Sequence, residues 1–260
     1  MLLRILIKEK EDMESKALNF IKRVITTLIL LPAVLYINHI GGIIFDLFLL
    51  IILVFSIIEV VNIVNKAKQM SIYQKLLWII LVSIYICCSL LSLKYIRSRP
   101  FGNIYIILLL SWIWIFDSAA YIVGSLVKGP KLCPVISPKK TWSGLIGGIC
   151  ATSLVSFLEA KLLLPHPSLV EAECVRLGII IPHFLSINVI MNMCYVTWIL
   201  IGVFIGLVGQ VGDILESYFK RKFGVKDSGN ILPGHGGILD RLDSVFLGAI
   251  FFYIIIYFCV

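Results

Sequence analysis

The part of the chain with the greatest chemical capacity is a polar run at residues 213–243, which lies between two apolar stretches. It combines carboxylates of the kind that hold a divalent cation with cationic groups of the kind that hold phosphate. The candidate residues in this run are Asp213, Glu216, Ser217, Lys220, Arg221, Lys226, Asp227, His235, Asp240, Arg241 and Asp243. Because the chain is 60% hydrophobic, this mixture beside a membrane predicts phosphate chemistry on a lipid.

The first half of the run has a helical spacing. Asp213, Glu216, Ser217 and Lys220 follow one another at i, i+3, i+4 and i+7. A helix over 205–222 would therefore place all of them on one face. The alternative is an interfacial helix whose polar face only meets water, and the spacing alone leaves both interpretations open.

The second half of the run ends in a pair of acids. Asp240 and Asp243 are three residues apart, so on a helical turn their carboxylates face the same way. Mg²⁺ usually takes one or two carboxylates together with substrate phosphates. The alternative is a capping cluster that stabilises the N-terminus of the last helix through the helix dipole. Since capping needs a single acid, the pair favours a metal site.

Two further segments have features of phosphate sites. The turn at 233–237 contains Gly236 and Gly237, whose N–H groups can form an anion nest, although an ordinary tight loop is the simpler explanation. The segment SPKKTW at 137–142 offers Lys139 and Lys140 as point charges for phosphate. Membrane orientation alone also explains these lysines. In the same segment, Thr141 is expected to cap the following helix.

The composition excludes an ordinary soluble domain. The mean hydropathy is +1.01, and charged residues make up 15% of the chain, against about 25% in typical soluble proteins. Long apolar runs predict transmembrane helices, because backbone polar groups cannot stay unpaired in lipid. The net charge of +8 does not indicate nucleic-acid binding, since the basic residues cluster between apolar segments. The cysteines show no metal-ligand spacing.

The hydropathy pattern predicts an all-α polytopic membrane protein with about seven full transmembrane helices, within a range of seven to nine. The expected spans are 21–40, 43–64, 76–93, 101–127, 142–164, 188–210 and 244–260. Residues 177–187 are apolar but short, so they are expected to form a partial, interfacial or re-entrant segment.

Positive charge in the loops predicts the sidedness. With a cytoplasmic N-terminus, the loop 128–141 and the run 213–243 share the cytoplasmic side, where helix ends and short loops would form the active site. One feature argues against this topology, because the predicted outer loop carries Lys94, Arg97 and Arg99.

We divide the chain into a cytoplasmic lead at 1–20, N-terminal transmembrane helices at 21–127 and a C-terminal catalytic membrane region at 128–260. A translation start at Met13 rather than Met1 is left open.

An ionisable side chain inside an expected span needs a partner or a function. Asp117 is a functional candidate, with structural pairing to a neighbouring helix as the alternative. Asp46 and Glu59 are weaker candidates, and Glu59 is expected to pair with Lys66 or to reach the interface.

Taken together, these residues resemble the CDP-diacylglycerol synthase family, whose members are also called phosphatidate cytidylyltransferases. The family pattern contains Ser-x-x-Lys-Arg, then Lys-Asp-x-Ser/Gly, Pro-x-His-Gly-Gly and finally Asp-Arg-x-Asp. Every fixed position has a match here at the right spacing, in Ser217, Lys220, Arg221, Lys226, Asp227, Gly229, Pro233, His235, Gly236, Gly237, Asp240, Arg241 and Asp243. Further matches are Gly212, Asp213, Glu216, Asp117, Ala120 and Tyr121. Residues 137–142 are similar to the family's second motif, but Ser143 stands where that motif has glutamate.

The resemblance implies transfer of a cytidylyl group from CTP to phosphatidate, which gives CDP-diacylglycerol and pyrophosphate. It implies Mg²⁺ as cofactor, with a monovalent cation such as K⁺ as an optional second ion. The implied metal ligands are Asp213, Asp240 and Asp243. The implied phosphate-binding residues are Lys220, Arg221, Lys226 and Arg241, with Lys139 and Lys140 as weaker candidates. Substrate positioning is implied for Ser217, His235, Gly236 and Gly237, and Asp227 is expected to orient Lys226.

The expected partners are CTP, phosphatidate and membrane lipids, without nucleic acid, and a homodimer is left open. The expected location is the bacterial cytoplasmic (inner) membrane. One rival function is a CTP-dependent prenol kinase, which would transfer a γ-phosphate to an alcohol. A rival of another class is an ion-coupled transporter that uses Asp117 and Glu59.

Overall fold

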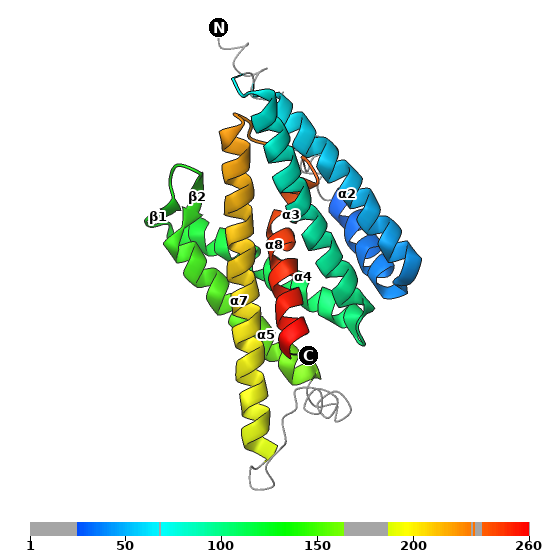
Figure 1. The fold of residues 1–260 in the computed structure, drawn as a ribbon. Coiled ribbons are helices and arrows are strands. Elements are labelled where there is room, and N and C mark those ends of the chain that lie inside the picture. Colours follow the sequence, from blue (N-terminus) through cyan, green and yellow to red (C-terminus); the bar gives the residue numbers. More distant parts are fainter. Residues whose placement is uncertain (1–24, 68, 164–186, 230, 232–235, 260) are drawn as a thin grey trace, which may run out of the picture.

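The structure is a computed structural model, and it describes residues 25–67, 69–163, 187–229, 231 and 236–259. Within these ranges the chain is almost entirely helical, which confirms the predicted all-α class (Figure 1). The helices are Ile25–Ile40, α2 (Gly42–Asn65), α3 (Ile72–Ser98), α4 (Gly102–Val127), α5 (Trp142–Leu163), α7 (Ile187–Lys222) and α8 (Leu239–Cys259).

Six helices of the described part of the chain are long and apolar enough to cross a membrane, and Ile25–Ile40 is a shorter apolar helix beside them. Each of the seven predicted spans thus corresponds to one helix, and the prediction of a polytopic membrane protein is confirmed. The predicted partial segment 177–187 lies outside the described residues, except for its last residue, which begins α7.

Helix α7 joins two predicted pieces, the span 188–210 and the polar helix 205–222, into one element of 36 residues. No proline interrupts this stretch. At 1.5 Å per residue the helix is about 54 Å long, whereas the hydrocarbon core of a bilayer is about 30 Å thick. The polar C-terminal turns of α7 can therefore lie beyond the apolar layer while its earlier turns cross it.

The loop after α4 folds as a small hairpin, which the sequence did not predict. Strand β1 (Lys131–Cys133) pairs antiparallel with β2 (Ser137–Thr141), and these are the strands of the described residues. The expected cap by Thr141 is confirmed, because its Oγ1 accepts a hydrogen bond from Gly144 N at 3.1 Å. Ser143 Oγ donates to Lys128 O across the base of the hairpin. The hairpin is therefore attached rigidly to the N-terminus of α5.

Close packing around Phe116 holds α4, α5 and α7 together. The Phe116 side chain is fully buried. A methyl group at Gly148 of α5 would lie 2.9 Å from its ring, and one at Gly206 of α7 would lie 2.5 Å from it. Small residues at such positions let helices approach closely in a membrane. This contact fixes the position of the neighbouring Asp117.

The three basic residues predicted in an outer loop have local partners in the structure, and two of them, Lys94 and Arg97, belong to the last turns of α3. Lys94 Nζ lies 2.8 Å from Asp46 Oδ2. Arg97 donates to two carbonyl oxygens at the end of the helix Ile25–Ile40, at 2.7 and 3.1 Å. Arg99 lies over a tyrosine ring, 5.1 Å from its centroid. The contacts of Lys94 and Arg97 join α3 to α2 and to the helix Ile25–Ile40 at this end of the bundle.

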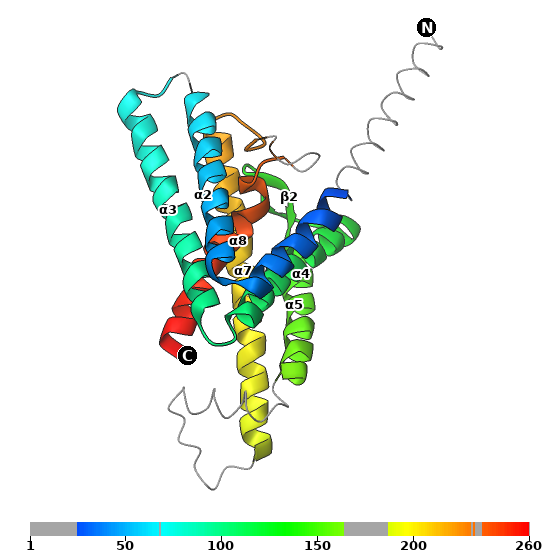
Figure 2. The same ribbon diagram turned by 90° about the vertical axis from the view of Figure 1, so that its right-hand side faces the viewer.

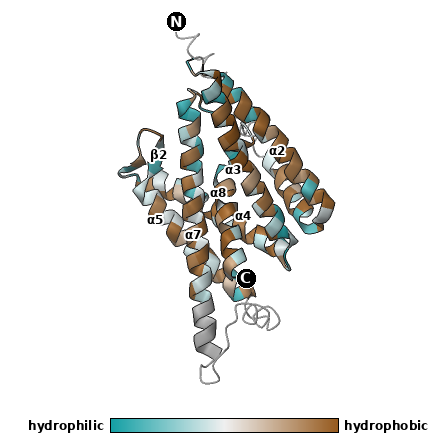
Figure 3. Ribbon diagram, in the orientation of Figure 1, coloured by the Kyte–Doolittle hydropathy of each residue, from teal (hydrophilic) through white to brown (hydrophobic). Residues whose placement is uncertain are grey.

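The polar segments meet at the opposite end of the bundle. Two views show the C-terminal ends of α2 and α7, the N-terminus of α8 and the hairpin at the same end (Figures 1 and 2). Hydrophilic residues collect there, whereas the middle of the helices is hydrophobic (Figure 3). The described parts of 128–141 and 213–243 therefore lie at the same end of the bundle, and the cytoplasmic location of this end stays a prediction.

Candidate active site

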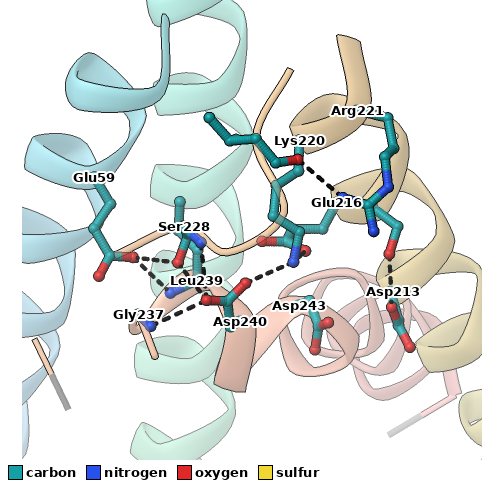
Figure 4. A network of polar contacts seen from close by, with 12 residues as sticks. Glu59, Asp213, Glu216, Lys220, Arg221, Ser228, Gly237, Leu239, Asp240 and Asp243 are labelled. Atoms are coloured by element: carbon teal, nitrogen blue, oxygen red, sulfur yellow. Dashed lines mark hydrogen bonds and ion pairs between the residues drawn. The ribbon is translucent and has the colours of Figure 1, made fainter. Parts of the chain in front are cut away.

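A buried lysine joins the two helices that carry the candidate site. Lys220 Nζ on α7 lies 2.5 Å from Glu216 Oε2 and 2.6 Å from Asp240 Oδ1 on α8 (Figure 4). The three side chains are only about one-tenth exposed (10%, 11% and 11%). Removing one member of such a buried group leaves an uncompensated charge, at a cost of about 3–5 kcal/mol. The i, i+4 spacing predicted for Glu216 and Lys220 is therefore realised as a contact.

A second lysine fastens the hairpin to α7. Lys140 Nζ lies 2.8 Å from Asp213 Oδ2 and donates to Gln210 O at 3.2 Å. Ser217 Oγ donates to the other Asp213 oxygen at 3.3 Å. Side chains alternate along a strand, and accordingly the neighbouring Lys139 is exposed. The structure thus separates the two lysines that the sequence treated together.

The carboxylate of Asp240 is held from several directions. Its Oδ2 accepts hydrogen bonds from Ser228 N at 2.9 Å and Gly237 N at 3.0 Å, and Ser228 Oγ lies 2.9 Å from the same oxygen. Its Oδ1 faces Lys220. Asp240 thus lies in the first turn of α8 as the capping alternative requires, and it also contributes to the buried charge cluster.

Asp243 lies deeper, where several acids converge. Its Oδ1 accepts a hydrogen bond from Ser244 N at 2.8 Å. Asp213, Glu216 and Asp117 are near enough for electrostatic repulsion with it. Asp117 itself accepts a hydrogen bond from Ser244 Oγ at 3.0 Å. The candidate acid inside α4 therefore joins the edge of the same cluster.

The oxygen atoms of these acids are of the kind that a hard cation takes, although the described residues form no ready-made cage. No three Asp, Glu, His or Cys side chains of the described ranges form a metal-binding group. Both carboxylate oxygens of Glu216 are buried, and apart from the ion pair with Lys220 no donor among the described residues reaches them. Mg²⁺ usually takes one or two carboxylates together with waters and substrate phosphates, so these oxygens are of a suitable kind.

Other predicted site residues lie apart from the cluster. Arg221 is exposed and donates to Val225 O at 2.9 Å, and Lys226 and Asp227 are also exposed. In the described part of the chain, no ion pair joins Asp227 to Lys226, so the expected orienting contact is not formed. His235 lies outside the described residues. Gly236 has a positive φ of 86°, which suits glycine in a tight loop.

Arg241 faces a different environment from the neighbouring acids. Together with Leu242 and Val245 it lines an apolar cavity of about 570 Å³ between the helix Ile25–Ile40, α2, α3, α4 and α8. Successive helical residues are rotated by about 100°. The start of α8 therefore presents Asp240 and Asp243 to the charged cluster and Arg241 to the apolar cavity.

The sequence missed the role of Glu59, and the prediction for it was wrong. Its side chain is 1% exposed, and it contacts neither Lys66 nor the interface. Instead its carboxylate accepts hydrogen bonds from Ile238 N at 2.9 Å and Leu239 N at 3.0 Å (Figure 4). The available signal was an acid within a long apolar run, which has to find internal donors.

Comparison with known proteins shows which family the chain resembles in sequence. A family model described as "Cytidylyltransferase family" matches residues 5–259. A protein named phosphatidate cytidylyltransferase from Rickettsia bellii (strain RML369-C) is 38% identical over 178 residues, which cover 68% of this chain and 68% of the relative. A namesake from Rickettsia prowazekii (strain Madrid E) is 38% identical, with coverage of 71% and 73%.

A third protein of the same name, from Brucella suis biovar 1 (strain 1330), is 40% identical over 167 residues. The match covers 64% of this chain but only 52% of the relative, so the chain spans about half the length of the Brucella protein. The family match includes the hairpin, both halves of the polar run and the helix that carries Glu59. The chain therefore belongs to the cytidylyltransferase family.

Proposed function

We propose that this protein transfers the cytidylyl group of CTP to phosphatidate, which gives CDP-diacylglycerol and pyrophosphate. The observation that carries the proposal is the first turn of α8. One side of this turn enters a buried cluster of carboxylates and lysines, and the other borders an apolar cavity that is also lined by Arg241. A reaction between a nucleotide and a lipid needs a polar and an apolar compartment that meet.

The chemistry follows from the charges of the two substrates. A phosphate oxygen of phosphatidate attacks the α-phosphorus of CTP, the bond from that phosphorus to the bridging β-oxygen breaks, and pyrophosphate leaves with the electron pair. Both reactants are anions, so catalysis depends mainly on positioning and charge stabilisation. Lys220 and Lys140 are already placed by carboxylates for this task. No general base is needed, because the attacking oxygen is ionised at neutral pH.

The proposed cofactor is Mg²⁺. The residues that would hold it are Asp213, Asp240 and Asp243, as the resemblance implies, with Glu216 added because its buried oxygens have no donor besides Lys220 among the described residues. When bound, the ion supplies positive charge to the triphosphate. A monovalent second ion remains a prediction from the resemblance.

The proposed location is the bacterial cytoplasmic membrane, with the polar end on the cytoplasmic side. Basic residues concentrate at that end, as the positive-inside rule expects, and CTP is a cytoplasmic metabolite. A homodimer remains open.

The first prediction concerns the reaction itself. Purified protein in lipid nanodiscs, given phosphatidate, Mg²⁺ and CTP labelled at the α-phosphate, should place the label in the lipid fraction, and EDTA should abolish this transfer. Label from the γ-phosphate on an added prenol, without α-label in lipid, would instead indicate the kinase. No transfer of either kind would contradict both.

The second prediction concerns the acids. Asp243→Asn should lower kcat about 100-fold or more, because it removes charge at the centre of the cluster. It should also raise the Mg²⁺ concentration that gives half-maximal rate. The control is Asp46→Asn, which removes an acid at the opposite end of the bundle. Equal effects of the two substitutions on the Mg²⁺ titration would contradict the metal assignment.

The third prediction concerns the hairpin. Lys140→Met should raise KM for CTP about tenfold, which corresponds to about 1.4 kcal/mol. Lys131→Met is the matched control, because this exposed lysine belongs to the same hairpin but makes no contact with α7 among the described residues. If both variants keep the native KM, Lys140 only orients the chain in the membrane.

The fourth prediction concerns the apolar cavity. Ile51→Trp should fill part of it and raise KM for long-chain phosphatidate several-fold, with KM for CTP unchanged. Ile58→Trp is the control, because Ile58 lies on the same helix with similar exposure (45% against 54%) but does not line the cavity. Equal KM values for both variants would exclude the cavity as the acyl-chain site.

A further inference from the structure

The N-terminus of α8 lacks a cap of its own. The first intrahelical hydrogen bonds run from Arg241 N and Leu242 N to Ile238 O, so Ile238 occupies the capping position. An isoleucine side chain has no hydrogen-bond acceptor, and it is among the least favourable residues at this position. The exposed N–H groups of the first turn therefore need acceptors from elsewhere.

Glu59 supplies these acceptors from a helix almost 180 residues away in the sequence. Its Oε1 accepts from Ile238 N and its Oε2 from Leu239 N, at 2.9 and 3.0 Å. Ser228 Oγ lies 2.9 Å from Oε2 and also 2.9 Å from Asp240 Oδ2. The carboxylate of α2 is thus connected through Ser228 and through the backbone to the acid that pairs with Lys220 (Figure 4).

Two glycines of the polar run leave room for this carboxylate because they have no side chain. A methyl group at Gly229 would lie 2.7 Å from Glu59 Oε1, and one at Gly237 would lie 2.6 Å from both carboxylate oxygens. The N–H of Gly237 is already donated to Asp240. The glycine that the sequence assigned to an anion nest therefore lets the loop close around Glu59.

Because the Glu59 carboxylate is buried, it depends on nearby hydrogen-bond donors. A carboxylate at 1% exposure carries a large desolvation cost unless donors surround it. Two backbone N–H groups, a hydroxyl and the positive end of the α8 dipole offset that cost. These donors, which are Ser228, Ile238 and Leu239, belong to the polar run 213–243. A movement of this run away from α2 would leave the buried carboxylate of Glu59 without hydrogen-bond donors, so the contact opposes such a movement.

We propose that Glu59 is a positioning residue, which fixes the start of α8 and thereby the placement of Asp240, Arg241 and Asp243 for the transfer reaction. The inference rests on the proposed function for its kinetic consequence, but the structural coupling does not depend on it. In this proposal Glu59 acts on the reaction through Ser228 and the amides of Ile238 and Leu239.

The test compares Glu59→Gln with Glu159→Gln in nanodiscs. Glu159 is another carboxylate within the helices, but it accepts from Ser111 Oγ and Trp112 Nε1, both at 2.7 Å, and among the described residues it forms no hydrogen bond or ion pair with α8. Glu59→Gln should lower kcat by about 10- to 100-fold, the size expected for a small misplacement of catalytic groups. KM for phosphatidate should stay within twofold, and Glu159→Gln should leave kcat near the native value.

Hydrogen–deuterium exchange gives a readout that needs no substrate. Peptides covering residues 236–242 should exchange faster in Glu59→Gln than in the native protein, with unchanged exchange in α4 and α5. Native exchange at 236–242 in Glu59→Gln would overturn the inference. If the native protein transfers no cytidylyl group but the exchange effect is present, the proposed function fails and the positioning role stands.

A second pair of variants tests the contact where Glu59→Gln does not fold. The three nearest atoms to a methyl group at Gly229 all belong to Glu59, and the backbone there is not left-handed. Gly229→Ala should therefore lower activity and speed exchange at 236–242, and Glu59→Asp, with a shorter side chain, should partly relieve both effects. An equal loss from Gly229→Ala in both backgrounds would overturn the inference.

Discussion

The rest of this structure depends on how the N-terminus of α8 is satisfied in a largely apolar environment. Its free N–H groups cannot be left unpaired where water is scarce, and the local sequence offers Ile238 at the cap. Glu59 from α2 accepts from Ile238 N and Leu239 N, and Asp240 accepts from Gly237 N just before the helix. The same contacts determine where the acids of α8 lie, so the capping of this helix also positions the residues of the site.

Charge compensation explains why a polar cluster can persist beside a membrane. Lys220 is shared by Glu216 and Asp240, Lys140 pairs with Asp213, and Asp117 has a hydroxyl donor. Compensation is least complete around Asp243 and Glu216, where like charges approach one another. A tightly packed site with uneven compensation is suited to anionic substrates and a cation, because their arrival changes the balance of charge locally.

Much of the fold could be predicted from the sequence, because transmembrane spans are continuous and apolar. The shared face of Asp213, Glu216 and Lys220 also followed from helical spacing. Helical spacing also places Arg241 on a different face of α8 from Asp240 and Asp243, although the three residues belong to one sequence motif. The partner of Glu59 could not be predicted, since its contacts to Ile238 and Leu239 depend on how α2 packs against the polar loop. Likewise, only the hairpin's strand alternation distinguishes Lys140 from Lys139.

The two faces of α8 provide a physical reason for placing this chemistry at a helix start. A helix turns by about 100° per residue, so within one turn it can present acids to a charged cluster and Arg241 to an apolar cavity. The backbone between them is short, and Glu59 accepts hydrogen bonds from its first amides. A nucleotide dissolves in water and a lipid in the bilayer, so the two substrates need different surroundings. The start of α8 contacts both the charged cluster and the apolar cavity, and can therefore bring the two substrates together. The polar run between two apolar stretches therefore marks, in the sequence, the place where water and lipid meet at the site.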